Sequence, residues 1–372
     1  MPTIKKLLGD GGRLVLMSHL GRPDEEPDQK HKYTLAPVAK RLSELLGVKV
    51  EPLPDCVGPQ VAERVGRLRD GEVVLLENLR FHPEETIKDK KTAADPRLKE
   101  KKETFARQVA ALGDAYVNDA FGTCHRDNAS MLTVPRLMEG KPRVAGYLVQ
   151  RELKFLGDAL ANPKRPFVCV LGGAKVSDKL GVIRSLLHRC DTILIGGAMA
   201  YTFLAANGQQ VGKSLVEPDL FDMARALRKE AGNKLRLPVD SVAAERIAPK
   251  INTTVCSTEI PPDLMGLDIG PQTIRAYADE LARAKTIVWN GPMGVFETPP
   301  FDAGTLALAS VIADATDRGA ISIVGGGDSA AAIDRAGLAD RMTHISTGGG
   351  ASLEFLEGKP FLPLDVLDEA NL

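Results

Sequence analysis

The sequence is poor in cysteine and in aromatic residues, and it has no surplus of charge of either sign. Only 5% of its 372 residues are aromatic, and its formal net charge is −1. Without a basic surplus, the chain has little with which to neutralise a nucleic-acid backbone. No apolar run reaches the roughly 20 residues that a membrane-spanning helix needs. We therefore expect a soluble protein that binds neither nucleic acid nor membrane.

The cysteines form no recognisable framework. They are odd in number and include no C-x-x-C pair, and they stand at Cys56, Cys124, Cys169, Cys190 and Cys256. Scattered thiols of this kind argue against disulfide bridges and zinc motifs, and they favour a reducing compartment. The pattern predicts a cytoplasmic protein.

Short strand patterns alternate with helical patterns along the chain. In the first half, the expected strands cover residues 13–17, 48–51, 72–76 and 115–117. This alternation predicts an α/β fold of parallel sheets with helices on both faces. The length predicts two domains. A helical stretch at 151–160 runs into a proline-rich segment, 162–166, and this predicts domains of residues 1–150 and 151–351.

One segment stands out by its charge. Residues 88–102 are rich in lysine, and the pattern continues into a helix that ends near Leu112. A run of like charges is most simply a solvated face. We expect residues 88–102 to be exposed to solvent.

Three expected strands of the first half end in a loop that carries an arginine. These arginines are Arg22, Arg80 and Arg126, with His19 and His125 beside them. The carboxyl ends of parallel strands meet at one edge of the sheet, where ligands bind. Guanidinium groups suit carboxylates and phosphates. These arginines therefore predict a binding site for a small polyanion in the first half of the chain.

In the second half, five expected strands end in glycine. The last but one reads Gly-Gly-Gly-Asp-Ser over 325–329 and opens a helix, with Ser329 as a plausible N-cap. Glycines let the backbone approach an anion, and the helix N-terminus offers unpaired N–H groups. Lys175 and Lys179 can neutralise phosphate charge. Glu297 and Asp328 can accept a ribose hydroxyl and a metal ion.

Six motifs, taken together and in order, resemble phosphoglycerate kinases. They are Ser-His-Leu-Gly-Arg-Pro (18–23), Val-Asn-Asp-Ala-Phe-Gly-Thr (117–123), Gly-Gly-Ala-Lys-Val-Ser-Asp-Lys (172–179), Trp-Asn-Gly-Pro-Met-Gly-Val-Phe-Glu (289–297), Gly-Gly-Gly-Asp-Ser (325–329) and Ser-Thr-Gly-Gly-Gly-Ala-Ser (346–352). The resemblance runs from about Pro2 to the C-terminus. It implies two Rossmann-like domains joined by the helix 151–160, with residues 352–372 packed back on the first domain.

The resemblance also implies the activity. A phosphoglycerate kinase transfers a phosphoryl group reversibly between 1,3-bisphosphoglycerate and ADP on one side and 3-phosphoglycerate and ATP on the other, in glycolysis and gluconeogenesis. The first domain is expected to bind 3-phosphoglycerate, and the second to bind ATP or ADP with Mg²⁺. The family pattern further suggests a monomer. Because transfer needs the phosphoryl donor and acceptor close together, we expect the two domains to close around the helix 151–160.

The residues to which the resemblance gives a role fall into three groups. The 3-phosphoglycerate ligands are His19, Leu20, Gly21, Arg22, Arg80 and Arg126. The groups that act on the phosphoryl in transfer are Lys175, Lys179, Gly348, Gly349 and Gly350. The nucleotide contacts are Gly172, Gly173, Lys179, Gly196, Gly197, Gly266, Asn290, Glu297, Gly326, Gly327, Asp328 and Ser329, with Asp328 also the expected metal ligand.

The sequence departs from the family pattern at its start. The family opens with a strand that carries an Arg-Val-Asp-Phe-Asn-type motif and a later arginine, and nothing here matches that segment. Two alternatives follow: Met1 is an internal methionine taken as the start, or the chain is a truncated nucleotide-binding protein with impaired catalysis. In either case we expect the chain as given to be poorly soluble and nearly inactive while it still binds nucleotide.

Overall fold

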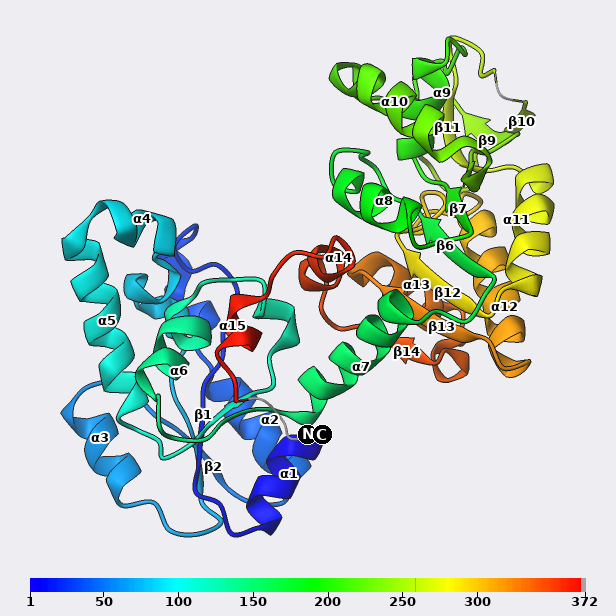
Figure 1. Cartoon of the computed structure of the whole chain (residues 1–372). Coiled ribbons are helices and arrows are strands. Elements are labelled where there is room, and N and C mark those ends of the chain that lie inside the picture. The colour runs from blue at the N-terminus through cyan, green and yellow to red at the C-terminus, as the bar shows by residue number, and fades with distance from the viewer. Residues whose placement is uncertain (258, 369–372) are drawn as a thin grey trace. The chain divides into compact units, whose positions relative to one another are not determined.

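The computed structural model describes residues 1–257 and 259–368, which form two compact units (Figure 1). The first unit comprises Met1–Arg151 and the chain from Phe361, and the second comprises Glu152–Pro360. The chain thus returns to the first unit at Phe361, later than the expected Ser352. The reason is that helix α14 (Gly350–Leu356) packs on α8 (Leu180–Leu187) of the second unit.

The second unit is organised around a six-stranded parallel sheet of order β14-β13-β12-β6-β7-β8. Its strands are β6 (Phe167–Leu171), β7 (Thr192–Ile195), β8 (Leu235–Arg236), β12 (Thr286–Asn290), β13 (Ile321–Gly325) and β14 (His344–Ile345). From β6 the chain builds outward through β7 and β8, and then returns to build the other side from β12. The strand order therefore reverses between β6 and β12, the place where open α/β sheets bind ligands.

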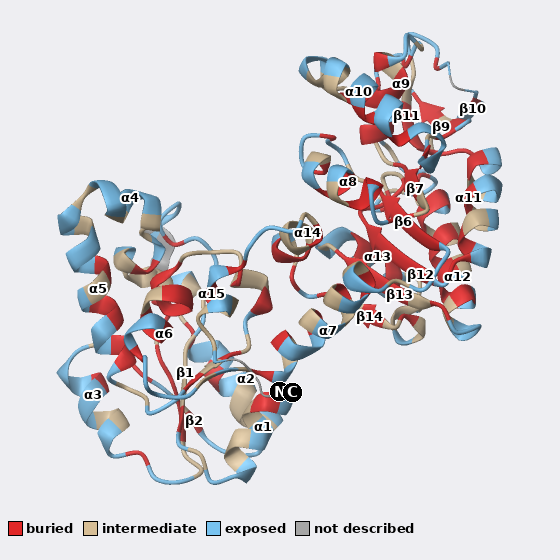
Figure 2. Cartoon of the chain, viewed as in Figure 1, coloured by how far each residue is buried: buried red, intermediate tan, exposed pale blue. Residues whose placement is uncertain are grey.

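Burial explains why these strands form. All five residues of β6 and all five of β12 are buried, and Figure 2 shows the buried class concentrated in the central strands. A parallel strand covered by helices on both faces reads as a continuous apolar run. The helices of this unit, besides the end of α7 (Tyr147–Ala161), are α8, α9 (Met199–Ala206), α10 (Phe221–Ala231), α11 (Pro271–Arg283), α12 (Ala303–Asp317), α13 (Gly327–Arg335) and α14.

A second, antiparallel sheet in this unit has no counterpart in the sequence-based prediction. Its order is β10-β9-β11, with β9 at Ser241–Ala244, β10 at Thr254–Cys256 and β11 at Met265–Ile269. A bulge interrupts the pairing of β11 with β9 between Gly266 and Asp268. The second unit is thus a parallel α/β sheet with a small antiparallel sheet added.

The first unit divides its strands between two parallel sheets. One has the order β1-β3-β2, from β1 (Leu14–Leu16), β2 (Val50–Pro52) and β3 (Val73–Leu75), and the other pairs β4 (Tyr116–Asn118) with β5 (Arg143–Ala145). The helices are α1 (Pro2–Gly9), α2 (Ala36–Leu46), α3 (Pro59–Gly66), α4 (Asp89–Ala94), α5 (Pro96–Ala110), α6 (Val134–Leu137) and α15 (Leu362–Asp365). In the described part of the chain, no helix is long and apolar enough to span a bilayer.

Helix α7 (Tyr147–Ala161) contains the boundary between the units. It begins at Tyr147, earlier than the expected Arg151. The Tyr147 backbone N–H donates to the Thr3 hydroxyl at 3.0 Å, and the Leu148 N–H donates to the Asp119 carboxylate at 2.8 Å. These side chains satisfy N–H groups that the first turn of a helix cannot satisfy itself.

The lysine-rich segment is only partly a solvated face. Lys102 on α5 is 2% exposed. Its ammonium group donates to the Asp89 carboxylate at 2.7 Å and to the carbonyls of Ile87 and Asp127 at 2.7 and 2.6 Å. A buried charge is tolerated when it is paired and fully hydrogen-bonded. Lys102 therefore holds the segment before α4 and the loop at Asp127 onto α5.

We predict that Lys102→Met destabilises the first unit. The substitution keeps an unbranched apolar stem but leaves the partly buried carbonyls of Ile87 and Asp127 without this donor, at about 1–3 kcal/mol each. The unfolding free energy of this unit, measured by urea denaturation, is expected to fall by about 2–4 kcal/mol. Lys101→Met, at an exposed position of the same helix, should change it little. Equal effects of the two substitutions would contradict the role given to Lys102.

Candidate functional site

The order of the strands brings the first set of predicted residues together in the second unit. β6 and β12 are neighbours, with Leu171 paired to Asn290. The loop after β6 carries Lys175 and Lys179, and Asn290 is the last residue of β12. The two segments therefore meet at the carboxyl edge of the sheet, at the point where the strand order reverses.

Lys179 lies buried at this edge, with 8% of its surface exposed. Its ammonium group donates a hydrogen bond to the Asn290 side-chain oxygen. Burial lowers the pKa of Lys179 to about 8, although the charges of Asp178 and Asp328 act in the opposite direction. At neutral pH most of the population still carries the charge. Since burial makes that charge costly, a nearby anion would stabilise it.

Asn290 has one buried group without a partner. Its Oδ1 accepts from Lys179, but its Nδ2 has no hydrogen-bond partner among the described residues. That nitrogen lies beside Gly326, where an added Cβ would come within 3.2 Å of it. A buried donor that makes no hydrogen bond costs roughly 1–3 kcal/mol of stability. The arrangement therefore suits an acceptor oxygen of a ligand at Gly326.

Several of the predicted glycines serve close backbone packing. The Gly172 N–H donates to the Asn290 carbonyl, and the Gly197 N–H donates to the Met293 carbonyl. A Cβ on Gly172 would collide with the Pro292 carbonyl oxygen, and one on Gly196 with the Met293 sulfur. The loops after β6, β7 and β12 are thus held directly against one another.

The turn after β13 exposes a carboxylate at a helix N-terminus. Gly326 is the N-cap of α13 with φ 91°, and Gly327 and Asp328 are the first two residues of the helix, both exposed. The expectation that Ser329 is the N-cap is wrong. Ser329 is fully buried inside the first turn, and its hydroxyl accepts from the Gly291 N–H at 2.6 Å. Ser329 ties the loop after β12 to α13.

The remaining predicted nucleotide contacts lie in different settings. Lys175 and Glu297 are exposed on the loops after β6 and β12. Gly173 has φ 110° and no atom within 4 Å of an added Cβ. Gly266 lies on β11 of the antiparallel sheet, buried against the Tyr201 ring. Of these four residues, only Gly266 lies outside the large parallel sheet and its loops.

A buried carboxylate positions the glycine loop after β14. Glu152 on α7 is fully buried and accepts from the Thr347 N–H at 2.9 Å, the Thr347 hydroxyl at 3.2 Å and the His344 ring at 2.8 Å. Burial opposes its ionisation, but the donors from His344, Ser346 and Thr347 outweigh burial, so the pKa of Glu152 is lowered. Gly348, Gly349 and Gly350 follow directly, and Gly350 begins α14.

In the first unit, His19 is held by a second buried carboxylate. The His19 Nε2 lies 2.7 Å from Oε1 of Glu85, which is fully buried. Glu85 also accepts from the Ser130 N–H at 2.9 Å and from the Ser130 hydroxyl at 2.6 Å. These contacts fix the orientation of the imidazole.

The loop that carries Leu20 and Gly21 is anchored by a buried amide. Asn78, which follows β3, donates to the carbonyls of Leu20 and Tyr33 at 2.7 and 3.0 Å. Its oxygen accepts from the N–H groups of Leu20 and Arg80 at 3.2 and 3.1 Å. One side chain thus joins the loops that follow two paired strands, β1 and β3.

The three predicted arginines gather in this unit. Burial lowers the pKa of Arg80, and the charges of Arg126 and Arg22 lower it further. The Arg80 guanidinium donates to the Gly21 carbonyl, whereas Arg22 pairs with Glu25 at 3.0 Å. Like charges held together raise one another's energy. A bound polyanion would relieve that repulsion.

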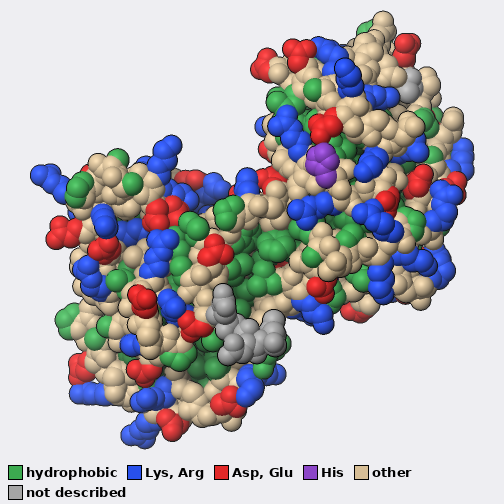
Figure 3. All heavy atoms as spheres, in the orientation of Figure 1, with side chains coloured by type: hydrophobic (Ala, Val, Ile, Leu, Met, Phe, Trp, Pro, Cys, Tyr) green, Lys and Arg blue, Asp and Glu red, His purple; other side chains and the backbone are tan. Residues whose placement is uncertain are grey.

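Charge on the visible face does not suggest a macromolecular polyanion. In Figure 3, Lys and Arg side chains alternate with Asp and Glu over both units, and no continuous basic surface appears on the face shown.

Three functional positions were missed by the sequence reasoning: Asn78, Glu85 and Glu152. Each is fully buried, and each bonds to a segment far away in the chain. Glu85 and Ser130 are 45 residues apart, and Glu152 and His344 are 192 apart. The sequence carries one signal for two of them, because Asn78 and Glu85 lie on either side of Arg80. It carries none for Glu152.

Comparison with known proteins gives one consistent result. The family model described as phosphoglycerate kinase matches residues 1–359. A phosphoglycerate kinase of Rhodopirellula baltica is 54% identical over 100% of this chain and 90% of its own length. One of Chlorobium phaeobacteroides is 52% identical over 99% of this chain and 90% of its own. The structure of phosphoglycerate kinase from Coxiella burnetii aligns with TM-score 0.84 at 39% identity, over 98% of this chain and 88% of that one.

We predict that Glu152→Gln destabilises the second unit in a pH-dependent way. The folded-state pKa of Glu152 is lowered below its ordinary value of 4.5. Its ionisation therefore stabilises the fold above about pH 4.5, and this contribution is lost as the pH falls through the folded-state pKa. At pH 7 the variant is expected to lose about 2–3 kcal/mol of unfolding free energy, the range for hydrogen bonds to a charged group. The difference should shrink toward low pH.

The exposed pair His188–Glu230 in the same unit provides the control, since its side chains are 77% and 49% exposed. Glu230→Gln should leave the unfolding free energy nearly unchanged at every pH. A Glu152→Gln deficit that stays constant down to low pH would show that the carboxylate charge is not what stabilises the loop.

Proposed function

Because the chain belongs to the phosphoglycerate kinase family, we propose that its two units divide the two substrates of that reaction between them. The chain is a phosphotransferase that acts between 1,3-bisphosphoglycerate with ADP and 3-phosphoglycerate with ATP. The alternative of a truncated nucleotide-binding protein with impaired catalysis is not supported by relatives about half identical over the whole chain. The further question is which residues perform each part of the reaction.

The first unit is proposed to bind 3-phosphoglycerate. The observation that carries this proposal is the cluster of Arg22, Arg80 and Arg126, in which burial and then the neighbouring guanidinium charges lower the pKa of Arg80. A small molecule with a phosphate at one end and a carboxylate at the other supplies the negative charge that the cluster lacks. His19, oriented by Glu85, would contact the same ligand, and Leu20 and Gly21 would line it.

The second unit is proposed to bind the nucleotide. The unpaired Asn290 Nδ2 and the turn at Gly326, Gly327 and Asp328 fit phosphate oxygens and a metal-bearing phosphate group. Glu297, exposed beyond β12, would accept from the ribose. Ser329 would act by holding the turn through its hydrogen bond with the Gly291 N–H. Gly172, Gly173, Gly196, Gly197 and Gly266 would shape the walls of the nucleotide site.

Asp328 is the residue that would hold Mg²⁺. Magnesium in such sites is bound through one or two carboxylates together with phosphate oxygens, and Asp328 is an exposed carboxylate beside the glycine turn. When bound, Mg²⁺ supplies charge neutralisation on the phosphate oxygens of the nucleotide.

Lys179 is proposed to stabilise the phosphoryl group in transfer. Phosphoryl transfer depends on positioning and on charge stabilisation of the equatorial oxygens. Lys179 is charged, buried and aligned by Asn290, so that its charge acts where water screens it little. Lys175 and the N–H groups of Gly348, Gly349 and Gly350 would complete the stabilisation. No general base is needed, because the carboxylate acceptor carries no proton to remove.

A coupled assay with 3-phosphoglycerate and Mg-ATP tests the assignment, beginning with Lys179→Met. We predict that turnover falls on the order of 100–1000-fold, the usual effect of removing one transition-state donor, while the affinity for Mg-ADP changes far less. Lys285→Met, at an exposed lysine of the same unit, should leave both unchanged. Normal turnover in Lys179→Met would remove Lys179 from the mechanism.

A second prediction concerns the arginine cluster. Arg126→Ala is expected to weaken 3-phosphoglycerate binding roughly 10–100-fold, since a hydrogen bond to a charged group contributes about 1.5–3 kcal/mol. Calorimetry should find Mg-ADP binding unchanged. The exposed Arg107→Ala on α5 serves as the control. Equal weakening of both ligands by Arg126→Ala would mean that the substitution damages the fold instead of the site.

The monomeric state, the closure of the domains during turnover and the cytoplasmic location remain predictions. Gel filtration with light scattering tests the first, and scattering with and without both substrates tests the second.

A further inference from the structure

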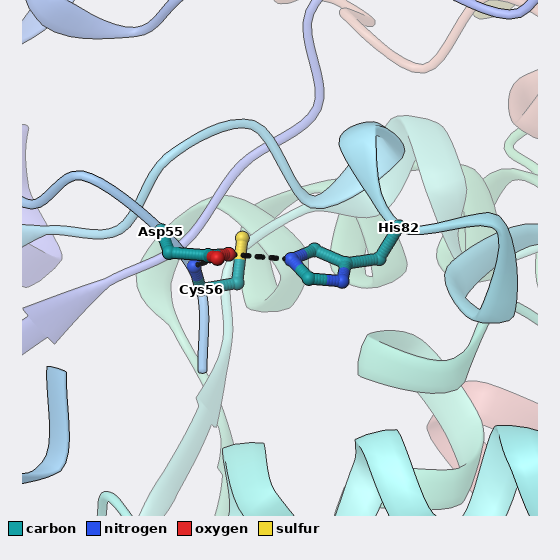
Figure 4. Close-up of side chains that lie close together, drawn as sticks. All are labelled: Asp55, Cys56 and His82. Carbon is teal, nitrogen blue, oxygen red and sulfur yellow. Dashed lines mark hydrogen bonds and ion pairs between the residues drawn. The ribbon is translucent and has the colours of Figure 1, made fainter. Parts of the chain in front are cut away.

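One cluster of metal-ligating side chains lies outside both proposed substrate sites. Asp55, Cys56 and His82 of the first unit place a carboxylate oxygen, a sulfur and a ring nitrogen within 4.8 Å of one another, and no other such group of three is found among the described residues (Figure 4). The sequence spacing does not suggest this cluster, because Asp55 and Cys56 follow β2 whereas His82 follows β3.

The three side chains are already oriented toward one another. The His82 Nε2 lies 2.6 Å from Oδ1 of Asp55, and the Cys56 sulfur lies beside them in Figure 4. The His82 ring is stacked on Phe105 with centroids 4.9 Å apart, which limits its rotation. The Asp55 carboxylate also accepts from the Cys56 N–H at 2.6 Å. The ligand atoms therefore start close to a common point.

We infer that Asp55, Cys56 and His82 form a binding site for a borderline-soft divalent cation of the zinc class. One sulfur, one nitrogen and one oxygen ligand match the donors that Zn²⁺ and Co²⁺ take, whereas Mg²⁺ prefers oxygen alone. Bond lengths of about 2.0–2.3 Å place tetrahedral ligands roughly 3.3–3.8 Å apart. The present spread of up to 4.8 Å needs a contraction of at most about 1–1.5 Å, and the His82 Nε2 and Asp55 Oδ1 atoms, now 2.6 Å apart, must move slightly apart.

The cation can reach two of the three ligands, His82 and Asp55, from solvent. His82 is 23% exposed and Asp55 is 51% exposed, so both side chains can adjust. His82 also lines a surface hollow of ≈ 640 Å³. With three ligands from the protein, the fourth position of a tetrahedral ion is left for water, as in open zinc sites.

Binding has a definite proton balance. The Cys56 thiol is fully buried and donates to the Glu77 carbonyl at 2.9 Å, and burial raises its pKa. Without a cation it is therefore a thiol. On binding, the S–H bond breaks, the sulfur forms a bond to the cation and the proton leaves to the buffer. Asp55 binds as the carboxylate and His82 binds through Nε2 as the neutral imidazole, with its one ring proton moved from Nε2 to Nδ1, so the hydrogen bond between His82 and Asp55 is also lost. The lost bond to Glu77 opposes binding, and the new charge on sulfur is neutralised by the ion.

Cobalt provides a direct test, because a Co²⁺–thiolate bond gives a charge-transfer band in the near ultraviolet that oxygen ligands do not give. We expect the full chain, freed of metal, to develop this band with one equivalent of Co²⁺ and to lose it when Zn²⁺ is added. Calorimetry in buffers of different ionisation enthalpy should show about one proton released per ion near pH 8. Binding of Co²⁺ at Asp328 would give no such band.

Variants separate this site from other thiols. Cys56→Ser should abolish the band, and Asp55→Asn and His82→Gln should weaken Co²⁺ binding at least roughly tenfold. Cys256→Ser, at a buried cysteine of the second unit, should keep the band. Since Cys56 is buried, its variant is checked by circular dichroism, and the two partly exposed positions test the site even if Cys56→Ser unfolds. A missing band in the unaltered chain, or a band that survives Cys56→Ser, would overturn the inference and leave a hydrogen-bonded trio only.

Discussion

The pairing of β6 with β12 is the interaction on which the second unit depends. These strands lie far apart in the sequence, and their parallel register sets Leu171 against Asn290. Because the strand order reverses here, the ends of the two strands lie at the position where open α/β sheets bind ligands. Lys179 and Asn290 meet only because this register holds. A slip of one residue would turn every side chain of β12 to the opposite face and separate the pair.

Buried polar groups play the same part in both units: they position the loops that carry the chemistry. Glu85 orients His19, Asn78 joins two loops, and Glu152 holds the loop after β14. Each makes at least three hydrogen bonds and is fully buried. Such groups are costly to bury unless every bond is made. The loops are therefore fixed in discrete arrangements, which suits a reaction whose catalysis depends on positioning.

The sequence predicted the parallel core well, for a physical reason. The strands expected before the glycine-marked ends of the second half include β6 and β7, and their pattern is clear because strands covered on both faces are continuous apolar runs. β5 and the antiparallel sheet were not predicted. β5 has only three residues, all of them partly or fully exposed, so it gives no apolar signal. Glu85, Glu152 and Lys102 read as surface charges, since their partners come from distant segments. Local pattern cannot show such pairings.

The glycine contacts between the loops after β6, β7 and β12 bear on how this site can evolve. The absence of side chains at Gly172 and Gly196 is what lets the loops touch, with the Pro292 carbonyl and the Met293 sulfur occupying the space. Even alanine at Gly172 would force two backbones apart. Substitutions that change ligand preference are therefore not expected at these glycines. They are expected at exposed neighbours such as Glu297. We therefore expect the packed glycine loops to stay the same and the exposed residues beside them to vary.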